Sequence, residues 1–366
     1  MKNYFPKLIL PIALLCVMAT ACKDDVQVTP VTTPDAPEIY ATDPNSTNVD
    51  GTRQSLAGGV GNQRNCSVMD VYYEDVKDDP SLPEKMKKVD EHTAKYNKGK
   101  NGAKAGATAQ ELAIAASLTD ATTIEIPVVV NVLYSNTLEN ISDAQIASQI
   151  TILNQDFRAT NSDLTKLATT TFFGKASDFN IHFTLLKTIR KSSTKTAWGT
   201  RNAMKSSKQG GIDPTNPTTT LNIWVCEIGS GLLGYAQFPG GASSTDGVVI
   251  GPKFFGNVGY ALTANTAYNK GRTATHEVGH WINLRHIWGD ATCGTDQVTD
   301  TPSHNAANYG CPTAGHVSTC SGAPVEMTMN YMDYTDDACM YMFTVGQKDR
   351  ARAIFATGGA RAAFVK

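Results

Sequence analysis

The sequence predicts an α/β fold of the α+β kind, in which a mixed, twisted sheet packs against helices. Residues 124–134 (IEIPVVVNVLY) form an almost continuous apolar, β-branched run, which is typical of a strand buried on both faces. A helical pattern of apolar residues follows at 142–157, and further strand patterns lie at 180–187 and 221–228. A helix that carries histidines comes after these strands. This order of elements indicates a sheet layered against helices.

The first 22 residues are typical of an export signal. Lys2 and Lys7 precede an apolar run at 8–18 that is too short to span a bilayer comfortably, and small residues then lead to Cys22. Small residues before a cysteine resemble the lipobox of bacterial lipoproteins, in which the cysteine is lipidated. We therefore expect a lipoprotein at the cell surface or outer membrane of a Gram-negative bacterium. An ordinary secretory signal, which would give a secreted protein, is the alternative.

Two segments separate the signal from the first strand. Residues 23–61 are rich in Thr, Pro, Asp, Asn and Gly, and we expect a flexible tether because they cannot bury enough apolar surface to offset chain entropy. Residues 62–121 are more structured, since Ser81 and Pro83 favour the start of a helix. A lysine-rich stretch at 95–104 follows, where we expect a flexible segment open to processing proteases. A plain solvated linker is the alternative.

Length and charge restrict the class of protein. A chain of 366 residues with a formal charge of −2 can bury one large core together with a smaller segment. The near-neutral charge offers no field to attract nucleic acid or an anionic membrane surface. We therefore expect no nucleic-acid partner, and contact with a membrane only through a lipid anchor. The oligomeric state stays open.

The pattern H-E-V-G-H at residues 276–280 carries the chemistry. On a helix, a spacing of four puts both imidazoles on one face, where they can bind the same Zn²⁺ beside Glu277. His286 reaches that ion only if the chain turns sharply, and Asn283 suits the turn because Asn tolerates the left-handed conformation. Three protein ligands leave a fourth position to water, as in hydrolytic zinc sites. Packed core histidines, or a zinc site without activity, are the alternatives.

Five segments form a more specific pattern in a fixed order. They are RNCSVMDV at 64–71, HEVGHWINLRHIWGD at 276–290, DTP at 300–302, YGCP at 309–312 and MNYMDYTDDACMYMFTVGQ at 329–347. Together they resemble the pappalysin family of metzincin zinc metallopeptidases, in particular its cytophagalysin-like branch. The resemblance implies a metzincin-type catalytic domain at 122–366, with a zinc-binding helix and a Met-turn. It also implies a small pro-segment at 62–121 that keeps the precursor latent.

The resemblance implies a role for each matching residue. The expected zinc ligands are His276, His280 and His286. Glu277 would be the general base that acts on the metal-bound water, and Tyr334 would stabilise the oxyanion. Met332 would be the Met-turn residue beneath the metal site. The implied activity is the hydrolysis of peptide bonds in proteins, while core packing for Met332 and a structural role for Tyr334 are the alternatives.

Four of the eight cysteines lie beyond the histidine motif. They are Cys293, Cys311, Cys320 and Cys339. In an exported protein these favour disulfides, and four cysteines can pair in three ways. The resemblance implies the pairs Cys293–Cys320 and Cys311–Cys339.

Cys66 lies in the expected pro-segment. A thiolate is a strong zinc ligand, so Cys66 could fill the open position on the metal until the segment is removed. We therefore expect it to act as a latency switch. An ordinary thiol, or a bridge to Cys226, is the alternative.

Two further expectations concern acidic residues. Asp296, Asp300 and Thr301 offer oxygen ligands where the family commonly carries Ca²⁺, although capping of a loop is the alternative. Some relatives cleave before Arg or Lys through an acid at the base of the pocket that follows the scissile bond. Asp336 and Asp337 are the candidates for that acid.

Three functions remain in competition. The first is a zinc endopeptidase that acts on proteins or peptides. The second is a catalytically silent surface lipoprotein that binds peptides or proteins, because the edge of the sheet beside the histidine helix could take up an extended peptide by strand addition. The third is a zinc hydrolase that acts on a non-peptide amide.

Overall fold

The computed structural model describes residue 1, residues 64–264 and residues 267–365. The expected export signal with Cys22, and the tether at 23–61, lie outside the described residues apart from Met1. Among the described residues, no helix is both long and apolar enough to cross a membrane.

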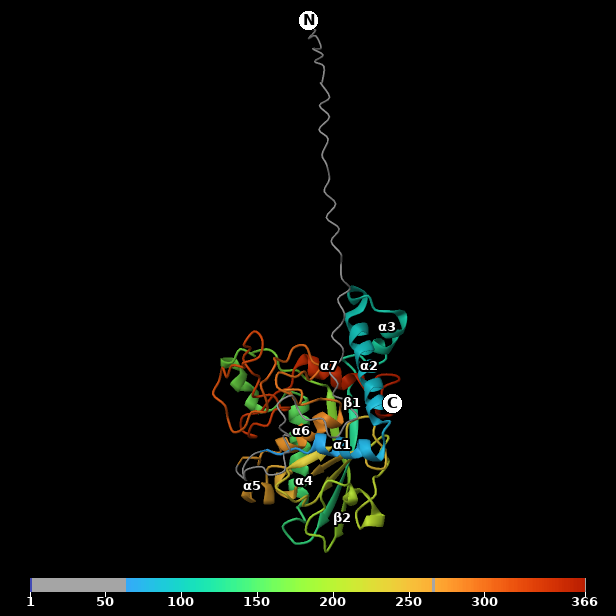
Figure 1. Cartoon of the computed structure of the whole chain (residues 1–366), viewed down its shortest axis with the longest axis vertical. Coiled ribbons are helices and arrows are strands. Elements are labelled where there is room, and N and C mark those ends of the chain that lie inside the picture. The colour runs from blue at the N-terminus through green and yellow to red at the C-terminus, as the bar shows by residue number, and fades with distance from the viewer. Residues whose placement is uncertain (2–63, 265–266, 366) are drawn as a thin grey trace. The chain divides into compact units, whose positions relative to one another are not determined.

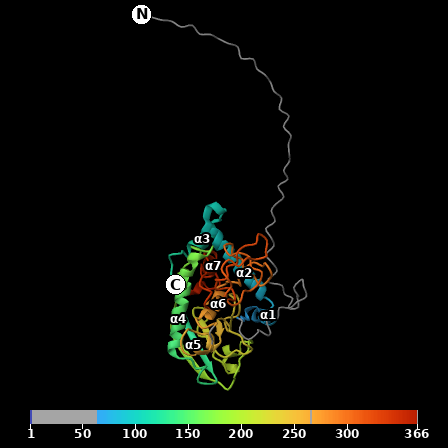
Figure 2. The ribbon, with the colours of Figure 1, turned by 90° about the vertical axis from the view of Figure 1, so that its left-hand side faces the viewer.

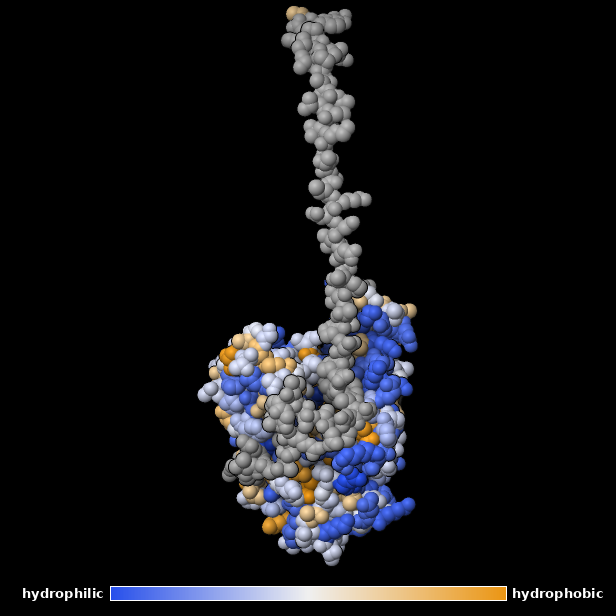
Figure 3. Space-filling model, in the orientation of Figure 1, coloured by the Kyte–Doolittle hydropathy of each residue, from blue (hydrophilic) through white to orange (hydrophobic). Residues whose placement is uncertain are grey.

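Three helices precede the sheet. They are α1 (Val68–Asp78), α2 (Leu82–Asn101) and α3 (Ala109–Ala116), and Figure 1 shows them in blue to teal. Helix α2 starts after Ser81 with Pro83 in its first turn, and it buries Met86 and Val89 against the rest of the protein. The outward side of α2 and α3 is strongly hydrophilic (Figure 3). The N-terminal segment is thus folded onto the protein from α1 onward.

The prediction of a flexible segment at 95–104 was wrong. Helix α2 continues to Asn101, and the 3₁₀ helix that begins at Gly102 follows directly. Gly99 packs so closely on α3 that a Cβ atom there would lie 2.0 Å from the carbonyl oxygen of Glu111. The ammonium of Lys100 forms ion pairs with Asp120 and with Asp349 of the C-terminal part. Lysines with helical spacing therefore lie on the solvated face of a helix here.

The sheet has five strands in the order β2-β1-β3-β5-β4. The strands are β1 (Ile124–Tyr134), β2 (Ile181–Ser192), β3 (Leu221–Val225), β4 (Gly234–Ala236) and β5 (Val248–Ile250). All neighbours pair in parallel except β4, which runs antiparallel to β5 at the edge. The sheet is therefore mixed, as the sequence predicts.

The remaining helices cover the sheet and complete the C-terminal part. They are α4 (Asp143–Phe157), α5 (Tyr260–Ala264), α6 (Arg272–Trp281) and α7 (Val345–Ala353). Short 3₁₀ helices span Gly102–Ala105, Ser162–Thr169, Ala203–Lys205, Ser207–Gln209, Pro252–Phe254 and Ala362–Phe364. Helices α4 and α6 contact each other and pack on the sheet, and Figure 2 shows α4 along one side with α6 further in.

The two faces of the sheet have different covers. On one face, the apolar side chains of β1 pack with α4 and α6 in the main core. On the other face, Trp198 and Met204 from the long connection between β2 and β3 pack against Trp224 of β3 and Tyr235 of β4. Strand β4 therefore has the histidine helix on one side and this connection on the other.

Two disulfides cross-link the part of the chain after α6. They join Cys293 to Cys320 and Cys311 to Cys339, with Cα–Cα distances of 5.6 and 5.5 Å. These are the pairs that the resemblance implied. Cys66 and Cys226 are both buried free thiols, so the alternative of a bridge between them is wrong.

Candidate metal centre

Two backbone hydrogen bonds stabilise the turn after α6, which places His286 near the other two histidines. Asn283 has a φ of 80°, the left-handed conformation that the sequence predicts for it. Its N–H donates to the carbonyl of His280, and the N–H of Leu284 donates to the carbonyl of Gly279, both at 2.9 Å. This crossed pair of bonds is a common way to end a helix at a left-handed residue. The chain then returns His286 toward α6.

Three imidazoles converge on one point. The Nε2 atom of His280 lies 3.1 Å from the Nε2 atoms of both His276 and His286. Two nitrogens that each bind one tetrahedral zinc ion at about 2.0–2.1 Å stand about 3.3 Å apart, so the spacing suits a shared ion. Burial, followed by the neighbouring imidazoles, lowers the pKa of His276 and His280 well below the usual value. The rings are therefore neutral, as metal ligands must be.

The other nitrogen of each ring has a partner that fixes its proton. The Nδ1 contacts are His276 with the carbonyl of Tyr331 at 2.7 Å, His280 with the carbonyl of Leu284 at 2.8 Å, and His286 with the carboxylate of Asp290 at 2.5 Å. Carbonyl and carboxylate oxygens only accept, so each Nδ1 carries the proton and each Nε2 presents a lone pair to the centre. The sequence reasoning had not assigned a role to Asp290, although it lies four residues after His286.

A fourth candidate ligand comes from the N-terminal segment. Within the described ranges, Cys66 and the three histidines form the group whose ligand atoms all lie within 4.8 Å of one another. The Cys66 thiol also donates to the carboxylate of Glu277 at 3.3 Å. Burial raises the pKa of the Cys66 thiol, and the nearby Glu277 carboxylate raises it further, while burial raises the pKa of Glu277 to about 8. A cation among the imidazoles would favour the thiolate instead.

The residues around Cys66 lie along the edge of the sheet. Cys66 forms a parallel bridge with Gly234 of β4. The N–H of Leu233 donates to the carbonyl of Asn65 at 3.1 Å, and the N–H of Ser67 donates to the carbonyl of Gly234 at 3.3 Å. An extended segment of the chain itself therefore occupies the edge where the sequence predicts strand addition.

Arg64 places a guanidinium in a buried acidic site beside the histidines. It lies 2.5 Å from Asp337 Oδ1, and both side chains are almost completely buried. The other carboxylate oxygen of Asp337 accepts from the N–H groups of Lys270 and Arg272, at 2.9 and 3.1 Å. Asp336 is only half-buried, so of the two acids that the sequence suggests, Asp337 faces the site. The sequence reasoning missed Arg64, whose position two residues before Cys66 was the available signal.

Met332 and Tyr334 both lie next to the histidines or the helix that carries them. A Cβ atom at Gly279 would lie 2.5 Å from the sulfur of Met332, which therefore packs directly beneath α6. The buried Tyr334 hydroxyl donates to the carbonyl of Cys66 at 3.1 Å, and its ring lies 5.0 Å from that of His286. Both residues thus lie close to the histidine cluster, and their roles as Met-turn residue and oxyanion donor stay predictions.

The residues expected to bind calcium are engaged with protein donors. The Thr301 hydroxyl lies 2.9 Å from both carboxylate oxygens of Asp296. The carboxylate of Asp300 accepts from the Thr344 hydroxyl at 2.7 Å and from the N–H of Gly346 at 2.9 Å. In the part of the chain that the structure describes, these acids do not belong to a group that could hold a metal ion. The structure therefore gives no support to the calcium expectation.

Comparison with known proteins gives a consistent result. The model of the family Peptidase_M43, described as pregnancy-associated plasma protein-A, matches residues 211–356. An extracellular metalloprotease from Arthroderma benhamiae is 32% identical over 242 residues, which are 65% of this chain and 79% of that protein. Extracellular metalloprotease 1 from Coccidioides posadasii is 31% identical over 225 residues, which are 59% of this chain and 70% of that protein.

Solved structures extend the comparison to the fold. Mature mirolysin of Tannerella forsythia, in complex with a cleaved peptide, is 45% identical and has a TM-score of 0.64, covering 67% of this chain and 96% of that chain. A promirolysin mutant from the same organism is 43% identical and has a TM-score of 0.65, covering 70% of this chain and 89% of that chain. The residues that the family model matches include β3, β4 and β5, the histidine helix α6 and the segment after it.

Proposed function

Because the chain belongs to the pappalysin family of metzincin metallopeptidases, we propose that it is a zinc endopeptidase made as a latent precursor. The chain is a metalloprotease, and its family implies zinc and peptide or protein substrates. The observation that carries the finer proposal is the convergence of three imidazoles and Glu277 on a point that Cys66 covers. We assign residues 62–121 to the pro-segment and 122–366 to the catalytic domain.

The chemistry follows from the residues at the centre. Zinc held by His276, His280 and His286 would polarise the scissile carbonyl and acidify a water molecule. Glu277 takes the proton of that water and delivers it to the leaving amine. The Tyr334 hydroxyl donates to the oxygen that becomes negative, which is worth roughly 2.7–4 kcal/mol for donors of this kind. Its present bond to the carbonyl of Cys66 supports this role, because a peptide carbonyl over the centre is already its acceptor.

Latency follows from the position of Cys66. Its sulfur fills the space beside Glu277 and the imidazoles, so neither water nor a substrate carbonyl can reach the base. A thiolate on zinc would hold that position strongly. The exposed segment between α2 and α3, which contains Lys104, is the site that we propose for the activating cut.

Specificity follows from the pair between Arg64 and Asp337. A buried carboxylate with two backbone donors on one oxygen and a guanidinium on the other is a site for a basic side chain. We propose that Asp337 receives Arg or Lys of the substrate at the position directly after the scissile bond. Arg64 occupies this site in the precursor.

The proposed location is outside the cytoplasm. Relatives of this chain are named extracellular metalloproteases, which supports secretion. Two disulfides within the catalytic part agree with an oxidising compartment. Lipidation at Cys22 is the finer proposal, and mass spectrometry of the N-terminal peptide from membrane fractions tests it.

Substitution of the base separates the proposed peptidase from a protein that only binds peptides. Glu277→Ala should abolish cleavage of a denatured protein by the processed chain while zinc content stays unchanged. The processed wild-type chain, given a peptide library, should produce new N-termini that begin with Arg or Lys. A processed wild type with bound zinc that cleaves nothing would contradict the proposal. New N-termini without a basic residue would contradict only the role of Asp337.

A further inference from the structure

A second polar site lies beside the pro-segment. Loops at 201–217 and 241–245 of the catalytic part line a cleft with a volume of about 770 Å³. Helix α1 and the turn after it close the cleft from the other side, through Asp75, Asp78 and Asp79. None of the zinc ligands lines this cleft, so it is separate from the metal centre.

The catalytic side of the cleft is basic. Its cations are Arg201, Lys205 and Lys208, and the acid that lines the same side is Asp213, whose carboxylate accepts from the N–H and the hydroxyl of Ser207. Lys205 lines the cleft and is only 2% exposed. Its ammonium donates to the carbonyl of Thr245 at 2.7 Å and lies 5.1 Å from the ring centre of Tyr235. Burial lowers the pKa of Lys205 to about 8, so the group stays charged at neutral pH. Proteins rarely bury an ammonium without a compensating charge nearby.

In the precursor, that compensation comes from Asp246 of the catalytic part and from Asp75 of α1. Glu74 forms an ion pair with Arg201, and Asp78, one turn further along the helix, lies 3.6 Å from the same guanidinium. Asp75 accepts from the amide of Asn202 at 3.5 Å and interacts electrostatically with Lys205. An acidic face of the pro-segment thus lies against a basic face of the catalytic part.

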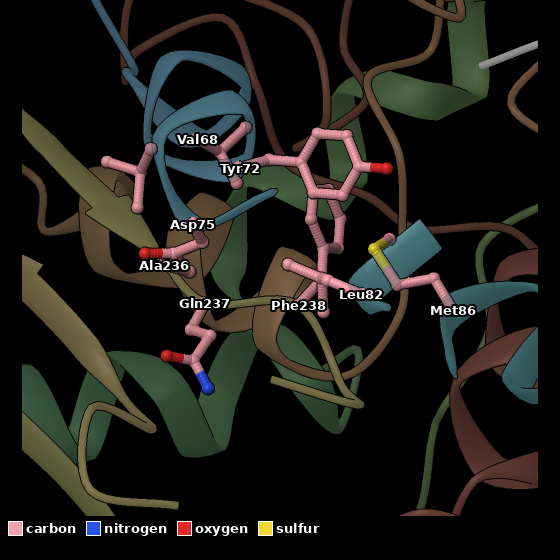
Figure 4. A pocket seen from close by; sticks show the side chains of 9 residues that line it. Val68, Tyr72, Asp75, Leu82, Met86, Ala236, Gln237 and Phe238 are labelled. Atoms are coloured by element: carbon pink, nitrogen blue, oxygen red, sulfur yellow. The ribbon is translucent and has the colours of Figure 1, made fainter. Parts of the chain in front are cut away.

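The apolar side chains of α1 hold its acidic face against the catalytic part. Val68, Val71 and Tyr72 line a small pocket together with Phe238, and Asp75 lines it near Gln237. Figure 4 shows Asp75 beside Ala236 and Gln237, at the end of the edge strand β4. The acidic face therefore follows the same edge of the sheet along which Cys66 lies.

The order of residues in the pro-segment indicates on which side of the scissile bond of a substrate the cleft lies. Arg64, Cys66 and α1 follow one another, and under the proposed function Arg64 marks the side that binds residues after the scissile bond. The cleft then lies on the side that binds the residues before it. From Cys66 to Asp75, one extended residue and a helical rise of about 1.5 Å for each further residue cover about 15 Å, which an extended peptide spans with about four to five residues.

We propose that this cleft is an exosite of the processed enzyme that binds acidic segments of protein substrates, roughly four to six residues before the scissile bond. In the precursor helix α1 forms one wall of the cleft, and it leaves with the pro-segment. Carboxylates of a polypeptide are the ligands favoured here, because those of α1 already fit the site. The inference rests on the proposed peptidase activity and adds a preference for acidic sequence to it.

Two quenched peptides that differ only in this segment provide the test. Both carry the same residues around the scissile bond, with Arg after it, and one has four acidic residues at the proposed positions where the other has their amides. With the full chain after activating cleavage, we expect kcat/KM to be about threefold to tenfold higher for the acidic peptide, mainly through KM. High ionic strength should remove the difference, because exposed charges are screened.

Variants assign the preference to the cleft. The double variant Arg201→Ser with Lys208→Ser should bring the ratio of the two kcat/KM values close to one. The matched control Lys175→Ser removes an exposed lysine that does not line the cleft, and should keep the ratio. Equal kcat/KM for both peptides with the wild type, or an unchanged ratio in the double variant, would overturn the exosite.

A binding measurement separates this inference from the peptidase proposal. A fluorescein-labelled peptide with the acidic residues but no cleavable bond should bind the processed chain in an anisotropy titration, and the double variant should bind it about threefold to tenfold more weakly. If the processed wild type cleaves neither peptide, the proposed function fails while this titration still decides the exosite. Equal binding by wild type and double variant would refute the exosite alone.

Discussion

Replacement of Arg64 by Met should unlock the uncut precursor. The guanidinium and Asp337 lie 2.5 Å apart with side chains 1% and 0% exposed, and under the proposed function the pair exists only while the pro-segment is docked. Removal of one partner from a buried ion pair costs about 3–5 kcal/mol. Asp337 keeps two backbone donors, which reduces the penalty, so we expect a loss of about 2–3 kcal/mol in docking free energy. The open fraction of the precursor should then rise roughly 30-fold to 150-fold.

The assay is the initial rate of cleavage of a short quenched peptide by intact precursor, with gel electrophoresis to show that the chain stays uncut. Because the rate follows the open fraction, Arg64→Met should raise it by the same factor. Arg64→Lys keeps the charge but loses the planar fork, and should give a smaller increase. Lys85→Met is the matched control, since it removes an exposed ion pair of α2 with Asp79 and should change the rate little. An Arg64→Met precursor that stays as latent as the wild type, with zinc bound, would refute the reasoning.

Three further predictions concern the support of the site and the buried lysine. Asp290→Asn should weaken zinc affinity about 10-fold to 100-fold in competition with a chelator, because the carboxylate orients His286; an unchanged affinity would contradict this. Gly279→Ala should lower the unfolding free energy by about 1–3 kcal/mol in denaturant titrations, since its Cβ would lie 2.5 Å from the Met332 sulfur, and a neutral result would show that Met332 moves aside. Folded Lys205 has a pKa of about 8, below the unfolded value of about 10.4, so the unfolded chain binds more protons between these values and stability from this group rises with pH. The wild type should therefore gain up to about 3 kcal/mol of unfolding free energy between about pH 8 and pH 10.4 relative to Lys205→Met, which lacks the titrating group. An equal pH dependence of unfolding free energy in the two proteins would contradict the burial argument.

Local chemistry explains which parts of the fold could be predicted from the sequence. Strand β1 has the predicted bounds because its β-branched run lies in the centre of the sheet, buried on both faces. Strand β5 was missed, since three residues carry too little periodicity to stand out. The stretch at 95–104 was misjudged because its glycines and lysines have low helical amphipathicity, while close packing on α3 holds it helical. Tertiary contacts decided the conformation there.

At the metal centre, too, the features that depend on neighbouring residues could be predicted, and the contacts between distant residues could not. The spacing of the three histidines and the left-handed Asn283 depend on residues close in sequence, and the sequence predicts the turn. The contact of Arg64 with Asp337 joins residues 273 positions apart, and no periodic pattern reports such a pair. The ion pair of Glu74 in α1 with Arg201 joins residues 127 positions apart. Such contacts follow only from the docked fold.

The direction of the segment along β4 has a consequence for self-cleavage. In the proposed assignment, the basic residue follows the scissile bond in a substrate, yet Arg64 precedes Cys66 in the chain. The pro-segment therefore crosses the metal centre backwards relative to a substrate. Compared with a bound substrate, the peptide bond of the pro-segment at the metal centre has its nitrogen and its carbonyl in exchanged positions. Glu277 is then wrongly placed to protonate the nitrogen that would leave as the amine. Under the proposed function, the precursor can then hold its inhibitor in the catalytic centre without digesting it, and the activating cut falls elsewhere, as proposed for the segment between α2 and α3.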